Sequence, residues 1–416
     1  MIQISKTLKM QKYFIIVAVT MLSLVSCTKF EDTAPPRKIT FGIATYRPQT
    51  KADETYKSVT TEFTTFKCKA FLHAENGANA FYATQDMFGA NGEDITPYKT
   101  GDVVWHNGDT DQILYWAPSH DYYWPKGQNS YINFIAWHDD KGTDPATSSE
   151  TSLSWTNYTV LPTDNLLFAD EAWHYKANAT NGPHYDGVTE GVPMIFHHAL
   201  AQICIKAAVT QTTKTNVTGG SSLGATKWVV TLSNISLERV YNQGTLSLTN
   251  SDPGDNRTKE WSATWTITGN STTISIPNPT SALPAVNDQN GPLVLLGMQS
   301  VLPQAIADDD NDDDDDIALS FNYLIRTRFD DGTNPAPYAQ VDDKGNLYPD
   351  EYAHEMVSVS IPLKDFTGEN LGNVWEMNKR ITYTVIINPE TKIIKIDPAV
   401  EEWVGRNGSY SYPNNN

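Results

Sequence analysis

Alternating apolar and polar residues recur along most of the chain after residue 38. Val357, Val359 and Ile361 alternate with serines, and apolar side chains occupy every second position from 319 to 325. Because successive side chains of a strand point to opposite faces, this period of two predicts strands with one buried face. No stretch of helical length carries apolar residues at the 3.6-residue period of a helix. The pattern predicts an all-β protein.

Turn residues separate the predicted strands at intervals of roughly 8–15 residues, a spacing typical of β-sandwiches. One hairpin is expected to turn at residues 388–391 (Asn-Pro-Glu-Thr). A polar, glycine-containing stretch over residues 178–191 interrupts the alternation and marks a domain boundary. We therefore expect an N-terminal sandwich over residues 58–190 and a C-terminal sandwich over 191–408, followed by a polar tail at 409–416.

The N-terminus has the parts of a bacterial export signal. Three lysines in residues 6–12 precede an apolar run over residues 13–25, which is too short for a membrane-spanning helix of ~20 residues. Leu24-Val25-Ser26-Cys27 then looks like a lipobox, whose cysteine takes a thioether-linked diacylglycerol and becomes the first residue. The sequence predicts a signal peptide over residues 1–27 and lipidation at Cys27, including acyl chains such as palmitate.

Charge excludes some classes of partner. The chain carries 30 basic and 49 acidic residues, a net charge of −19, and three of its lysines belong to the signal peptide. The remainder, with 27 basic residues against 49 acidic ones, would repel nucleic-acid phosphates and anionic lipid headgroups. We expect no nucleic-acid binding, and membrane attachment through the lipid alone.

Residue patterns for catalysis or metal binding are missing from the sequence. HExxH, GxSxG, P-loop and Rossmann fingerprints do not occur. His197 and His198 are neighbours on a predicted strand, so their rings should point to opposite faces instead of sharing an ion. The aromatic residues between Trp105 and Trp137 suit core packing, with stacking on sugars as the alternative. We expect no enzyme, no cofactor and no metal site.

Residues 28–57 combine a tether with a strand that should fill a slot in the first sandwich. Ile39, Phe41 and Ile43 alternate with smaller residues and should fill one apolar face. The polar segment that follows contains Lys51-Ala52, a bond open to a trypsin-like protease.

Taken in order along the chain, these features resemble the fimbrillins, or type V pilins, which are lipoprotein pilus subunits of Gram-negative anaerobes. The resemblance implies two tandem transthyretin-like β-sandwich domains. It also implies cleavage after an Arg or Lys that removes the first strand, here Ile39 to Tyr46, so that a strand of the next subunit can enter. The motifs that carry it are the lipobox, KITFG (38–42), TKAD (50–53), YWP (123–125), INFIAW (132–137), DNLLFA (164–169), VPMIFHHALAQICIKA (192–207), NQGTLSL (242–248), VLPQ (301–304), VSIPL (359–363), WEMNKRITYTVII (375–387) and VEEW (400–403).

The family resemblance also implies partners and a location. Partners would be other pilin subunits, an Arg/Lys-specific protease, the outer membrane through the lipid anchor, and host protein or glycan receptors. The location would be the outer membrane surface and the fimbrium. The chain departs from the best-known members in having Lys51 instead of Arg before the cut, and residues 409–416 are polar, which leaves stalk, tip, anchor and accessory roles open. The alternative function is a surface lipoprotein that binds glycans through its aromatic loops without polymerising.

Three further features stay open on the sequence. Translation begins at Met1 or at Met10, since either start keeps the apolar run. Cys68 alternates with lysines and should face a core; it forms a disulfide with Cys204, or both are buried free thiols. The acidic run over residues 308–316 has the first spacings of a calcium loop but lacks its Gly and Glu, so a solvated loop is expected instead.

Overall fold

The computed structural model of the protein is almost entirely β-strand, which confirms the predicted all-β class. Within the described residues, the one helical element is a 3-10 turn, η2 (Leu363–Phe366). No helix in these residues is long and apolar enough to cross a bilayer. The structure describes residues 38–45, 63–74, 86–88, 101–107, 114–125, 130–175, 191–214, 226–250, 258–307, 316–329, 339–341, 347–349, 356–366 and 373–403.

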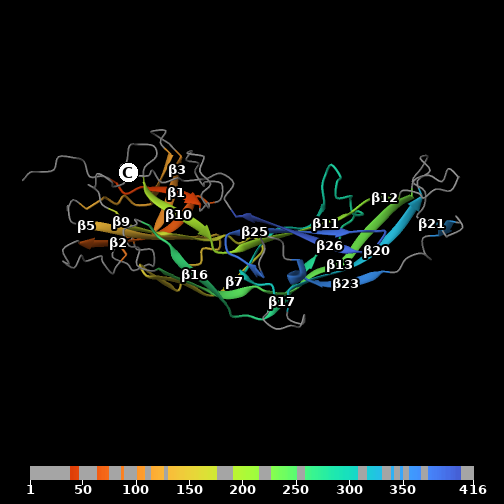
Figure 1. Cartoon of the computed structure of the whole chain (residues 1–416). Coiled ribbons are helices and arrows are strands. Elements are labelled where there is room, and N and C mark those ends of the chain that lie inside the picture. Colours follow the sequence, from red (N-terminus) through yellow and green to blue (C-terminus); the bar gives the residue numbers. More distant parts are fainter. Residues whose placement is uncertain are drawn as a thin grey trace, which may run out of the picture. The chain divides into compact units, whose positions relative to one another are not determined.

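A sheet of nine strands, counted over the described residues, forms the first part of the fold (Figure 1). It follows the order β15-β9-β5-β2-β3-β4-β1-β10-β8, and β8 also pairs with β5, so the strands from β5 to β8 form a closed ring, to which β9 and β15 are attached at β5. Each strand of the closed ring has a neighbour on both sides, and the ring encloses apolar side chains. The strands are β1 (Phe41–Thr45), β2 (Thr65–Ala74), β3 (Asp102–Asn107), β4 (Leu114–Pro118), β5 (Ser130–Asp139), β8 (Leu166–Ala169), β9 (Glu171–Tyr175), β10 (Val192–His198) and β15 (Thr258–Lys259).

Two facing sheets form a sandwich in the second part. One has the order β18-β11-β25-β26, and the other has the order β12-β13-β20-β23 with β17 also paired to β13. Their inner faces share one apolar core that includes Ile205, Leu232, Phe321 and Tyr383. The strands are β11 (Ala201–Val209), β12 (Thr213–Lys214), β13 (Thr226–Tyr241), β17 (Ser271–Ile276), β18 (Leu293–Val301), β20 (Ala318–Phe329), β23 (Val357–Pro362), β25 (Lys379–Ile387) and β26 (Ile394–Glu402).

A further sheet, in the order β16-β14-β7-β6, contributes Trp155 and Leu246 to a cluster shared with Trp137 of β5 and Trp403. Segments far apart in the sequence therefore meet in one core. This sheet consists of β6 (Thr147–Ser149), β7 (Ser152–Thr159), β14 (Gln243–Asn250) and β16 (Trp261–Ile267); the small pairs are β19 (Gln304–Ala305) with β24 (Val374–Trp375), and β21 (Ala339–Val341) with β22 (Leu347–Pro349).

The chain passes from the closed sheet to the sandwich at Ala199 and Leu200, between β10 and β11. The sequence suggested a boundary between residues 190 and 191, one strand earlier. The alternation continues through residues 192–207 without Gly or Pro at the reversal, so the local pattern does not show that two strands are present. Independent folding of residues 58–190 and 191–408 stays a prediction.

Candidate functional site

The first strand, β1, is one of the strands of the closed ring and pairs with β4 on one side and β10 on the other; Figure 1 labels β1 and β10. It runs parallel to β10, in register from Phe41 opposite Val192 to Thr45 opposite Phe196. On its other side it meets β4 antiparallel, with Phe41 opposite Trp116. Parallel neighbours cannot be joined by a tight turn, so β1 and β10 come together only through a long stretch of chain.

Backbone hydrogen bonds extend this contact beyond the strand itself. The Ile39 amide donates to the Tyr122 carbonyl at 2.8 Å, and the Val192 amide donates to the Thr40 carbonyl at 2.8 Å. Val192 of β10 and Tyr122, which follows β4, therefore have backbone partners in residues 39–40, and such groups are costly to leave unsatisfied when buried.

Ile39, Phe41 and Ile43 are buried in the core of the closed sheet, with 1%, 3% and 4% of their surfaces exposed. The alternation predicts these three side chains on one face of the strand and the smaller residues between them on the opposite face. Thr40 is also buried, at 8% exposed, and so is Gly42. The strand is flanked by others on both sides, which shields positions that a period of two assigns to solvent.

The ring of Phe41 is surrounded by three others. Phe66, Phe88 and Phe134 lie with centroids 5.9, 6.3 and 5.4 Å away and with interplanar angles of 80°, 87° and 90°. Near-perpendicular rings at this separation are the edge-to-face arrangement that aromatic side chains prefer. We call Phe66, Phe88 and Phe134 the phenyl cage.

The backbone of Phe41 can approach residue 191 closely because residue 191 is glycine. A Cβ atom there would lie 2.5 Å from the backbone N and Cα of Phe41 and would also overlap its carbonyl carbon. Such separations are far below ordinary carbon contacts of about 3.5–4.0 Å. Sequence reasoning missed Gly191, since a local sequence offers no sign of a tertiary contact with residue 41.

Three predicted site residues, Cys27, Lys51 and Ala52, lie outside the described residues. Lipidation and proteolysis therefore stay predictions. The strand to which they relate, β1, ends at Thr45, six residues before Lys51.

Cys68 and Cys204 are both free and buried. Cys68 faces the core of the closed sheet, as the alternation with lysines predicted. Burial, with a contribution from the charge of Asp86, raises the pKa of the Cys68 thiol well above its ordinary value. Burial also raises the pKa of the Cys204 thiol. A protonated buried thiol is a poor nucleophile, so neither cysteine is a reactive site.

His197 and His198 point to different surroundings, as expected for neighbours on a strand. The His197 ring stacks on Phe168 and lies 2.9 Å from a carboxylate oxygen of Asp170. The His198 ring stacks on Trp403, with centroids 3.8 Å apart. Burial first, and then the charge of Arg380, lower the pKa of His198 well below its usual range, so it is neutral at pH 7.

Several of the aromatic residues that could have stacked on sugars are buried in the core instead. Trp116, Trp124 and Trp137 are 2%, 7% and 1% exposed. Tyr123, in contrast, is 42% exposed. The three tryptophans cannot present a ring face to a glycan in this structure. No group of three or more His, Cys, Asp or Glu side chains in the described ranges is arranged to hold a metal ion.

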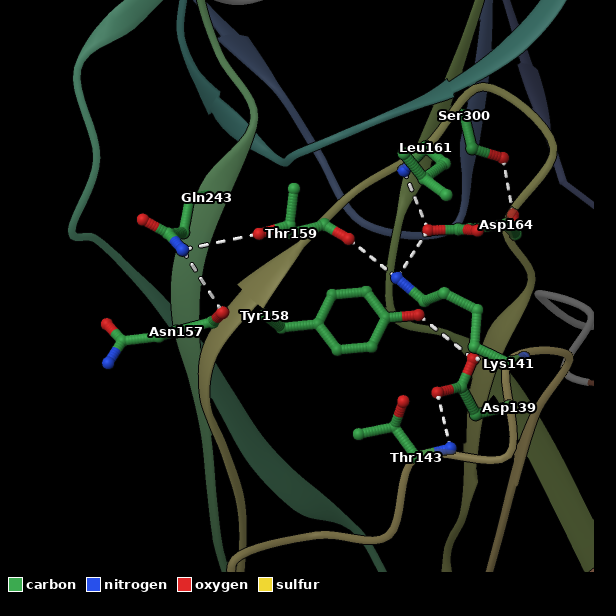
Figure 2. A network of polar contacts seen from close by, with 10 residues as sticks. All are labelled: Asp139, Lys141, Thr143, Asn157, Tyr158, Thr159, Leu161, Asp164, Gln243 and Ser300. Atoms are coloured by element: carbon green, nitrogen blue, oxygen red, sulfur yellow. Dashed lines mark hydrogen bonds and ion pairs between the residues drawn. The ribbon is translucent and has the colours of Figure 1, made fainter.

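A partly buried polar network connects β5, β7 and β18 with the loop residues Lys141 and Asp164 (Figure 2). The Tyr158 hydroxyl donates to Asp139 at 3.0 Å, and the Lys141 ammonium lies 2.7 Å from the Asp164 carboxylate. Ser300 of β18 donates to the Asp164 carbonyl at 2.6 Å. Burial, helped by the nearby Asp139, raises the pKa of the Tyr158 hydroxyl. These groups bond to one another, so the network holds the strands and loops that carry them in place.

The acidic run differs from the expected solvated loop at its last residue. Asp316 is fully buried and lies 2.5 Å from the ammonium of Lys364, in η2. Arg239 donates to the Asp316 backbone carbonyl. The long-range partner Lys364 explains the difference, because a local acidic composition does not reveal it. Residues 308–315 lie outside the described residues, so calcium binding there stays untested.

Comparison with known proteins gives one family match and several structural likenesses. The model of the fimbrillin-like family matches residues 84–403. A crystal structure of a fimbrial protein from Bacteroides vulgatus aligns with 88% of this chain and 100% of its own, at 15% identity and a TM-score of 0.47. A candidate cell adhesion protein from Bacteroides uniformis aligns with 90% of this chain and 100% of its own, at 12% identity and a TM-score of 0.39. A search of curated proteins found no match.

Proposed function

Because the chain belongs to the fimbrillin-like family, we propose that it is a pilus subunit that serves adhesion and assembles by strand exchange. Family membership gives it a fimbrial or adhesive role at the cell surface. The route of assembly is the proposal. The observation that carries the proposal is the position of β1, which completes the closed sheet between β4 and β10.

Removal of β1 would create an acceptor for another strand. The two flanking strands would lose their backbone partners, and each buried unsatisfied group costs roughly 1–3 kcal/mol. Ile39, Phe41 and Ile43 would leave apolar sites, each worth about 1.5–3 kcal/mol on burial. A strand from a neighbouring subunit recovers both contributions, which is β-augmentation of an open edge.

In the proposed order of maturation, the protein is first exported and lipidated at Cys27, and the lipid would hold it at the outer membrane surface. A protease specific for Arg or Lys would then cut between Lys51 and Ala52, which would separate residues 52–416 from β1 and the lipid. Other pilin subunits are the proposed assembly partners, with the chain as a shaft, tip, anchor or accessory subunit. We propose no enzymatic role.

Size-exclusion chromatography of residues 28–416 tests the assembly step. The uncut protein should elute as a monomer, and digestion should yield Ala52 as a new N-terminus. A pilin donor strand added to the cut protein should then form a stable complex. The matched control, Lys51→Ala, should stay uncut and take up no donor. A cut protein that has lost β1 and still binds no pilin strand would contradict the proposal.

Membrane attachment has its own test. Cys27→Ala should abolish acylation and either release the protein from the membrane fraction or leave it unprocessed. Cys27→Ala protein that still partitions normally into detergent would exclude the lipid anchor without bearing on strand exchange.

A further inference from the structure

We infer that the groove left by β1 selects its donor strand by a phenylalanine in the place of Phe41. This inference rests on the proposed strand exchange and adds the feature by which a donor is recognised. It follows from the phenyl cage, which contacts Phe41 at the middle of the buried row formed by Ile39, Phe41 and Ile43.

The cage does not depend on β1 for its position. Phe66 and Phe134 belong to β2 and β5, which pair with each other in register from Lys67 to Ala74. Neither strand pairs with β1. The cage should therefore stay in place when β1 leaves, ready for an incoming ring.

The third ring is held by its own set of hydrogen bonds. The Asp86 carboxylate accepts from the Phe88 amide at 2.9 Å and from the Ala70 amide at 3.0 Å. The Met87 amide also donates to the Ala70 carbonyl at 2.8 Å. These bonds fasten the residue 86–88 segment to β2, so Phe88 too is positioned without help from the first strand.

The geometry favours a phenyl ring over other side chains. An aliphatic side chain would lose the edge-to-face contacts, which are worth about 0.5–1.5 kcal/mol per pair beyond burial. A tyrosine would bring a hydroxyl among three phenyl rings, and a buried hydroxyl without a partner is unfavourable. A tryptophan would overfill a space shaped for one ring. The expected partner is a pilin strand with apolar residues at alternate positions and phenylalanine at the central one.

Gly191 sets how closely the donor backbone can approach. Because a Cβ at this position would overlap the Phe41 backbone, the glycine lets the incoming strand lie at the depth that brings its central ring into the cage.

Peptide competition tests this selection with the protein left unchanged. Residues 28–416 are cut after Lys51, or at a protease site inserted after Thr45 if that bond resists. The cut protein is incubated with a fluorescent peptide of residues 38–46, and binding is read as fluorescence polarisation. Unlabelled peptides then compete: the native sequence, forms with Phe41→Leu or Phe41→Ala, and a scrambled sequence. Ile43→Val serves as the matched control.

The native peptide should compete best, and Ile43→Val should weaken it no more than about tenfold. Phe41→Leu should weaken it by more than Ile43→Val and by at least about tenfold, because it removes three edge-to-face contacts, and Phe41→Ala should weaken it by at least about a hundredfold. The inference fails if the Phe41→Leu or Phe41→Ala peptide competes within about threefold of the native peptide. The groove would then bind a strand through its backbone and general apolarity without selecting phenylalanine, and the proposed strand exchange would be unaffected. If the labelled native peptide never enters the cut protein, or the scrambled peptide competes equally, strand exchange itself fails.

Discussion

Adding one methyl group at Gly191 should weaken the docking of β1. In Gly191→Ala the new Cβ would lie 2.5 Å from two backbone atoms of Phe41. Backbone in the middle of a closed sheet cannot turn aside as a flexible side chain can, so the strand or its neighbour β10 must shift. Overpacking of this kind typically costs about 1–3 kcal/mol, and that loss of unfolding free energy is the expected effect.

Gly297 in β18 offers a matched control for the same substitution. A Cβ there meets no described heavy atom within 4 Å, and the residue is exposed. Both alanines reduce the conformational freedom of the unfolded chain equally, a contribution of about 0.4–1 kcal/mol in favour of the folded state. The difference between Gly191→Ala and Gly297→Ala therefore isolates the clash with Phe41.

Urea unfolding of residues 28–416, followed by tryptophan fluorescence, measures both variants. Trp116 and Trp124, two of the eleven tryptophans, belong to the core that β1 completes, so unfolding of the closed sheet contributes to the signal. Gly191→Ala should unfold at a lower urea concentration than Gly297→Ala with an unchanged slope. After proteolytic removal of β1 the two variants should converge. Equal midpoints before cutting would show that β1 does not approach residue 191 as closely as described.

Other buried groups give three further predictions. Lys364→Met leaves the Asp316 carboxylate buried without its cation and should lower the unfolding free energy by about 3–5 kcal/mol, measured by urea unfolding. The pKa of His198 is lowered in the folded state, so the unfolded chain binds a proton at this residue more readily and the unfolding free energy should fall as pH drops below about 6.5. His198→Asn should flatten this part of the curve of unfolding free energy against pH, and an unchanged slope would contradict the lowered pKa of His198. Cys68 and Cys204 should react with a thiol reagent only after denaturation, and rapid labelling of the native protein would refute their burial.

Local alternation predicted the strands and the residues that form the apolar row of β1. It also predicted that His197 and His198 would face different surroundings, because strand geometry alone separates adjacent side chains. What it could not predict was the neighbour of each strand. Phe41 lies opposite Val192, far along the chain, and a parallel pairing at that separation leaves no mark on either segment.

Long-range contacts also account for the positions where the prediction from the local sequence and the structure differ. Thr40 has the polarity of a solvent-facing residue, yet its place in a closed sheet buries it. Asp316 ends a run that reads as solvated, yet Lys364 supplies a charge that allows its burial. Gly191 looks like a flexible loop residue, yet it lies against a strand from the start of the domain. In each case the deciding partner is distant in sequence.

A closed sheet also explains how the proposed subunit would remain a monomer until it is cut. While β1 is covalently attached, its effective concentration at its own groove is high, and an outside strand cannot compete with it. Cutting near Lys51 would leave every contact of Phe41 unchanged but would end that advantage, because the strand, left on the lipidated fragment that begins at Cys27, is no longer joined to its own groove. A donor strand on a neighbouring subunit can then occupy the groove. Cleavage would thus change the occupant of the groove without any change in the shape of the groove, which is why a rigid cage suits both the resident strand and its replacement.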